Sequence, residues 1–172
     1  RYQMLRSQVK DLRAILLTHG HKDHIGGLDD VRAFNWVKQG AVDVYGNEGT
    51  REVVYKDFSY AFAAFRYPGV PEINYHVIDD RPFYIDDIQV VPIPVLHYKM
   101  PVLGFRIGNF AYITDAKTIP ASSMERLKGV EYLVINALRK ELHMSHFNLE
   151  EALTMIARIQ PKSAFLTHIG HQ

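Results

Sequence analysis

The feature that most constrains this chain is a short polar segment that directly follows a mainly apolar run. Residues 12–17 are rich in leucine and isoleucine, and residues 18–24 then read Thr-His-Gly-His-Lys-Asp-His. The apolar run predicts a buried strand, because it is short and leads into a loop that contains glycine. Imidazole nitrogen and carboxylate oxygen are ligands that divalent transition metals accept when no thiolate is present. The segment therefore predicts a metal centre at the end of a strand, with more than one ion.

The composition fits one globular domain and excludes several kinds of site. The 172 residues are 47% hydrophobic and 23% charged, and no apolar run approaches the roughly 20 residues that a membrane helix needs. The absence of cysteine excludes disulfides, thiolate zinc sites and cysteine nucleophiles, and it is compatible with the cytoplasmic location that we expect. The net charge of +1, with scattered basic residues, favours a small substrate over a long nucleic acid, and we expect no membrane partner.

Helical and strand patterns are interleaved along the chain. We expect strands at 12–17, 42–45, 73–78, 82–85, 88–96, 102–107, 110–114, 132–135 and 164–167. We expect helices at 28–34, 48–65, 122–128 and 149–159. The last helix has Asn148 as a suitable N-cap and is followed by Pro161. This order predicts a single domain over residues 1–172, in which helices cover β-sheets in a layered α/β fold.

Three further candidate ligands stand where expected strands end. His97 follows residues 88–96, Asp115 follows residues 110–114, and His168 follows residues 164–167. Rigid strand ends can hold side chains with the accuracy that a metal requires. Taken alone, a histidine at a strand end is more often a surface residue, and an aspartate there is often a turn former. Together with residues 19–24 they are predicted ligands, whereas His76 is interpreted as an ordinary strand residue.

The spacing His-x-His-x-Asp-His resembles the signature of the metallo-β-lactamase superfamily. The resemblance implies an α/β fold of the αββα four-layer sandwich type, here lacking the N-terminal hairpins, so we expect a domain truncated at both ends. It also implies two divalent ions, zinc or manganese, with iron also suited to these ligands. One ion would bind His19, His21 and His97, the other Asp23, His24 and His168, and Asp115 would bridge both.

The later part of the chain narrows this resemblance. Residues 136–139, 143–153 and 166–171 resemble the phosphodiesterase branch typified by phosphoribosyl cyclic phosphate phosphodiesterase. The resemblance implies that His146 is the general acid toward the leaving oxygen and that Asp23 shares the catalytic role. The residues implied to contact the substrate are His143, His146 and His171. Because His146 precedes a helix N-terminus, the helix dipole also favours a phosphate nearby.

The implied reaction is hydrolysis of a small cyclic or nucleotide-like phosphodiester by a metal-bridging hydroxide, and a homodimer is common in that branch. Two other hydrolases of the superfamily remain alternatives. A tRNA 3′-processing nuclease shares the metal ligands, although no basic arm-like insertion is visible here, and a thioester hydrolase normally appends a helical region. A non-enzymatic protein with a vestigial metal site is a third alternative. All seven positions implied to bind metal carry a histidine or an aspartate, which argues against a site that has lost its function.

Overall fold

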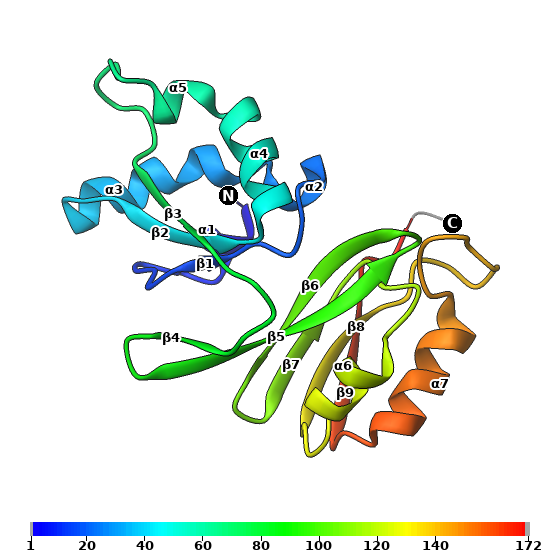
Figure 1. The fold of residues 1–172 in the computed structure, drawn as a ribbon. Helices are drawn as coiled ribbons and strands as arrows, with labels where there is room; N and C mark the ends of the chain where they lie inside the picture. Colours follow the sequence, from blue (N-terminus) through cyan, green and yellow to red (C-terminus); the bar gives the residue numbers. More distant parts are fainter. Residues whose placement is uncertain (1, 171–172) are drawn as a thin grey trace. The chain divides into compact units, whose positions relative to one another are not determined.

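Two separate β-sheets organise the chain, one in each half of the sequence (Figure 1). The computed structural model describes residues 2–170 and divides into unit 1, Arg1–Asp79, and unit 2, Asp80–Gln172. The prediction of one domain over the whole chain stays a prediction. No helix within residues 2–170 is long and apolar enough to cross a membrane.

Unit 1 is a three-stranded parallel sheet with short helices before and between its strands. The strands are β1 (Ile15–Leu16), β2 (Val42–Gly46) and β3 (Ile73–Val77), in the order β1-β2-β3. The helices are α1 (Tyr2–Arg6), α2 (Lys22–Ile25), the 3-10 helix η1 (Leu28–Val31), α3 (Arg32–Lys38), α4 (Glu48–Asp57) and α5 (Ser59–Phe62). Parallel neighbours need a crossover between them, and the helices supply it.

The core of unit 1 lies on one face of this sheet. Val42 and Val44 alternate with the less buried Asp43 and Tyr45, as the two-residue period of a strand requires. The buried valines pack with Val54 of α4 in one hydrophobic cluster. This packing fixes α4, which begins where the Asn47 side chain accepts a hydrogen bond from the Thr50 N–H.

Unit 2 is a six-stranded mixed sheet in the order β4-β5-β6-β7-β8-β9. The strands are β4 (Phe83–Ile85), β5 (Ile88–His97), β6 (Met100–Ile107), β7 (Phe110–Ile113), β8 (Tyr132–Asn136) and β9 (Ser163–Thr167). Neighbours from β4 to β7 are antiparallel, whereas β7, β8 and β9 run parallel. Helices α6 (Ala121–Arg126) and α7 (Leu149–Ile159) form the two crossovers, so the carboxyl ends of β7, β8 and β9 share one edge.

Apolar side chains from the sheet and both helices form the core of unit 2. Ile113, Leu133 and Ile135 are fully buried and cluster with Ala152 of α7. The predicted cap of α7 is confirmed, because Asn148 and Glu151 form a reciprocal capping box. The helix ends at Ile159, and the next residue, Gln160, has a left-handed backbone and precedes Pro161.

Most expected elements are confirmed, and the differences have local causes. The strand expected at 12–17 is only Ile15–Leu16, because just two residues pair with β2. The continuous helix expected at 48–65 was wrong. The chain leaves helical geometry at Phe58, whose side chain is buried in the core, and α5 follows as a separate turn. Helices α1 and α2 were not predicted, since four or five residues are too few to show a period.

Candidate metal centre

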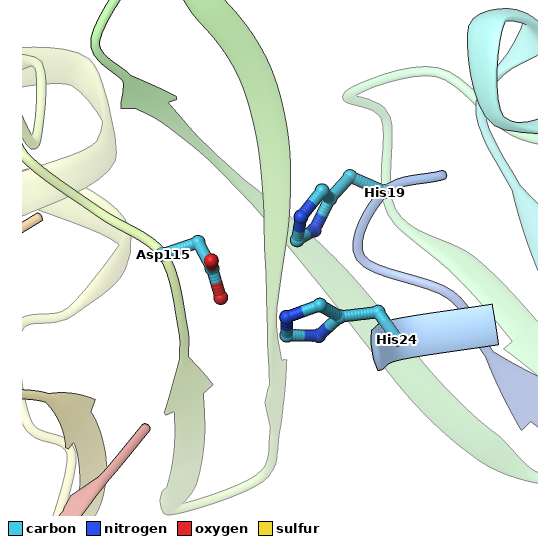
Figure 2. Close-up of side chains that lie close together, drawn as sticks. All are labelled: His19, His24 and Asp115. Carbon is cyan, nitrogen blue, oxygen red and sulfur yellow. The ribbon is translucent and has the colours of Figure 1, made fainter. Parts of the chain in front are cut away.

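In unit 1 the histidine-rich segment folds into a loop and the short helix α2. His19 is buried in the loop after β1, His21 is the N-cap of α2, and Asp23 and His24 lie within that helix. His19 Nε2 is 3.0 Å from His21 Nδ1, and the His19 and His24 rings, drawn in Figure 2, have centroids 4.3 Å apart. Asp23 Oδ2 lies 3.3 Å from His24 Nε2. These four predicted residues therefore come together within unit 1.

The surroundings of this loop constrain its side chains. The Thr18 hydroxyl lies 3.0 Å from His19 Nδ1, so the other ring nitrogen is the one directed at His21. Gly20, between the two histidines, packs against α4. A Cβ atom at Gly20 would come within 2.9 Å of Val53 Cβ and Cγ2, closer than side-chain atoms normally approach. Glycine is therefore required for the loop to lie this close to the helix.

In unit 2 the corresponding cluster surrounds Asp115, which lies just beyond the end of β7. Its carboxylate is buried, with Oδ1 3.0 Å from His146 Nε2 and 3.3 Å from His168 Nε2 (Asp115 is drawn in Figure 2). The Thr114 hydroxyl donates to the other oxygen, Oδ2, at 2.6 Å. The ligand atoms of Asp115, His146 and His168 all lie within 4.8 Å of one another, close enough to share an ion.

His97 is the last residue of β5, and its orientation is set by a backbone group. His97 Nδ1 lies 2.9 Å from the carbonyl oxygen of Ser145. A carbonyl can only accept a hydrogen bond, so Nδ1 is the donor, and in the neutral ring the lone pair is then on Nε2. That tautomer is the one in which Nε2 can ligate a metal. The ring also meets His146, at a centroid distance of 4.4 Å.

His143, Ser145 and His146 form a small hydrogen-bonded group beside this cluster. The Ser145 hydroxyl lies 3.0 Å from His146 Nδ1 and 3.2 Å from His143 Nδ1. Burial lowers the pKa of His146, although the neighbouring Asp115 carboxylate opposes the effect. Burial and the Arg139 charge also lower the pKa of His143. His171, the third predicted substrate contact, lies outside the described residues.

Two aspects of these clusters were not anticipated. His146 was predicted only as an acid and substrate contact, yet it lies among the groups of unit 2 that could hold a metal. The hydroxyls of Thr18 and Thr114 were also missed. A threonine directly precedes His19, Asp115 and His168 in the sequence, and this recurrence was the available signal.

Comparison with known proteins places the chain in a family. The family model described as "Beta-lactamase superfamily domain" matches residues 1–169. The chain belongs to the metallo-β-lactamase superfamily. The crystal structure of a diphosphatase from the PhnP family superposes with a TM-score of 0.91 and 34% identity, covering 99% of this chain and 65% of that one. The fold class predicted from the sequence is confirmed, as is the resemblance to this branch.

Two curated relatives carry different names. An octanoyltransferase of Porphyromonas gingivalis (strain ATCC BAA-308 / W83) is 38% identical over 173 residues, which cover 99% of this chain and 35% of that protein. A ribonuclease Z of Mycobacterium bovis (strain BCG / Pasteur 1173P2) is 32% identical over 149 residues, covering 76% of this chain and 53% of that protein. The chain thus spans between about a third and two thirds of the length of these two relatives and of the diphosphatase.

Proposed function

We propose that this chain carries the catalytic site of a metal-dependent hydrolase that acts on a small phosphodiester. One observation carries the proposal: a buried carboxylate, Asp115, has the ring nitrogens of His146 and His168 at 3.0 and 3.3 Å. A carboxylate oxygen and imidazole nitrogens this close together form a donor set that divalent transition metals accept. The second cluster, in unit 1, offers three further imidazoles and a carboxylate.

The donor set fits divalent ions that accept nitrogen and oxygen, such as zinc or manganese, with iron also suited. We assign two ions to seven residues, with Asp115 shared between them: His19, His21, Asp23, His24, His97, Asp115 and His168. When bound, the metals supply Lewis acidity and lower the pKa of water. Asp23 and Asp115 partly neutralise that charge, and the remaining positive charge favours an anionic substrate.

His146 is assigned as the proton donor to the leaving oxygen. Its Nε2 is held 3.0 Å from Asp115, whose charge favours the protonated ring, while burial lowers its pKa. A lower pKa makes the protonated ring a stronger acid, which helps a departing alkoxide to leave. Ser145 holds the other ring nitrogen of His146, and we assign His143 and His171 to contacts with the substrate.

The substrate class is inferred from the relatives and from charge. The diphosphatase of the PhnP family, at 34% identity, supports a phosphoester. The name octanoyltransferase belongs to a protein of which this chain covers 35%, and the chain has no cysteine to carry an acyl group. The ribonuclease Z relatives favour a second candidate, cleavage of a tRNA precursor. The net charge of +1 favours the smaller substrate.

The test is hydrolysis of bis(p-nitrophenyl) phosphate by the full natural protein, stripped of metal and reloaded with manganese or zinc. We expect turnover that depends on metal and that Asp115→Ala abolishes, since loss of a shared ligand removes several kcal/mol of stabilisation, about a thousandfold or more in rate. Turnover that survives in Asp115→Ala contradicts the shared-ligand assignment.

A parallel assay with a tRNA precursor carrying a 3′ extension decides between the two candidates. Cleavage of the precursor at a higher kcat/KM than the small diester would favour the nuclease. Metal bound tightly without turnover of either ester would contradict both.

A further inference from the structure

Three turns of unit 2, each carrying a candidate metal-site residue, are tied to residues 136–138 at the end of β8. None of these three residues has a metal-binding side chain in our assignment. The side chain of Asn136 is fully buried and forms two hydrogen bonds with the backbone of Ala116, the residue after Asp115. Asn136 Oδ1 accepts from the Ala116 N–H at 2.8 Å, and Asn136 Nδ2 donates to the Ala116 carbonyl at 3.0 Å.

The same carbonyl links this turn to the one that carries His146. The Ala116 oxygen also accepts from the N–H of Phe147, the residue after His146, at 2.8 Å. The Phe147 carbonyl in turn accepts from the Leu138 N–H at 3.0 Å. The Asp115 and His146 turns are therefore held together by a shared acceptor and by residues 136–138.

The third turn, which carries His168, is attached to the next residues of the same segment. The Ala137 N–H donates to the carbonyl of Thr167, directly before His168, at 3.0 Å. The Gly170 N–H donates to the Leu138 carbonyl at 2.8 Å. Bonds on both sides of His168 thus fix its turn to residues 137 and 138.

Two of the three turns use a backbone conformation that these residues rarely adopt. Asp115 has φ 54° and His168 has φ 52°, both in the left-handed region. A left-handed backbone at a residue other than glycine is uncommon and is held in place by its surroundings. The hydrogen bonds from residues 136–138 are the restraints that flank both positions.

We propose that Asn136 is a positioning residue that sets the spacing of Asp115 and His146, whose turns meet at the backbone of Ala116 that its side chain holds. A carboxamide at this place can bond both the N–H and the carbonyl of Ala116, whereas an ionised aspartate has no donor and leucine has neither group. The inference rests on the proposed function, since it assigns Asn136 a role toward the metal site.

The experiment measures cobalt(II) binding to the full natural protein, by the intensity and position of the visible absorption band and by titration. Asn136→Ala and the nearly isosteric Asn136→Asp are compared with wild type, and circular dichroism reports folding. We expect both variants to bind cobalt about 10–100-fold more weakly, with an altered band, as loss of outer-shell partners does.

Asn35→Ala is the matched control. Asn35 is also a buried amide that holds backbone groups, those of Gly40 and Glu72, but it lies in unit 1 outside the candidate ligands. Asn35→Ala should lower the midpoint temperature of thermal unfolding and leave the cobalt affinity and the absorption band unchanged. An equal loss of cobalt affinity in Asn35→Ala would overturn the proposal, because the effect would then be general destabilisation.

Wild-type affinity and band in a folded Asn136 variant would also overturn it. If Asn136→Ala does not fold, Asn136→Asp decides. Wild-type protein that binds no cobalt would instead refute the proposed function, and the positioning role with it.

Discussion

The two units assemble their candidate ligands in opposite ways. In unit 1 the ligands lie between His19 and His24, on one loop and the four-residue helix α2. In unit 2 they come from His97, Asp115 and His168, which follow or end three different strands. The first cluster is set by local geometry and one packing contact, whereas the second depends on the order of strands in a sheet.

This difference shows through which contacts a substitution would disturb each cluster. Strands β7, β8 and β9 are parallel neighbours, so the turns that carry Asp115 and His168 emerge at one edge with β8 between them. Carboxyl ends of parallel strands are a common place for binding sites for this reason. A change in unit 2 therefore acts through hydrogen bonds between strands, while a change in unit 1 acts through the loop and α4.

The largest effect should come from removing one ligand from each unit. His21→Ala and His168→Ala should each reduce the bound metal from two ions per chain to one, because we assign them to different ions, and activity should fall about a thousandfold. Metal content after gel filtration measures this. His76→Ala is the control, since His76 pairs with Asp43 on β2 and should leave both ions in place. Loss of both ions from either ligand variant would contradict the assignment.

The next effect concerns the role of His146 within unit 2. If it is a proton donor, His146→Asn should keep the metal content and lower kcat by about 10²–10⁴-fold. His143→Asn changes a residue that lies beside Ser145 and His146 and that we assign to substrate contact, and it should have a smaller effect. Loss of metal from His146→Asn would instead identify His146 as a ligand, which its place beside Asp115 and His168 permits.

A packing change should affect unit 1 selectively. In Gly20→Ala the new methyl group would meet Val53, so we expect a stability loss of about 1–3 kcal/mol and weaker metal binding. Val53→Ala in the same chain should restore part of both, because it removes the two Cγ atoms that collide but leaves Cβ, which would still lie 2.9 Å from the added methyl group. Urea unfolding and metal titration measure the pair. Gly27→Ala, with no atom within 4 Å of its added Cβ, is the control. A double variant that recovers no stability would exclude the Cγ atoms of Val53 as the cause.

The smallest effect is electrostatic and lies in unit 2. Burial raises the pKa of Glu151, but hydrogen bonds from Lys117 and the Asn148 backbone outweigh it and hold the pKa below its usual range. A depressed pKa contributes stability above the unfolded pKa, and this contribution is lost as pH falls through the folded pKa. Glu151→Gln, which keeps a capping acceptor, should lose about 0.5–1 kcal/mol at pH 7.

Urea unfolding of wild type and Glu151→Gln at pH 7 and pH 3 checks this, and the difference should shrink at the lower pH. A difference that is the same at both pH values would assign the effect to hydrogen-bond geometry rather than charge.

Much of the fold could be predicted because its signals are local. The cap at Asn148, the strand β2 and the helix α7 were read from periodicity and end signals. The break of the helix at Phe58 could not be predicted, because the burial of that side chain depends on distant residues. The place of His146 beside Asp115 also escaped prediction, since it depends on how the loop after β8 returns to the sheet.

The sequence by itself determined the chemistry of the candidate site. It supplied imidazoles and carboxylates without thiols, clustered four of them between His19 and His24, and placed three more near strand ends. Only the tertiary structure decided which ring nitrogens meet which oxygens and which residues hold them there. Three features are non-local: the strand order, the left-handed turns at Asp115 and His168, and the hydrogen bonds from Asn136 to Ala116. Each depends on hydrogen bonds between residues far apart in the chain.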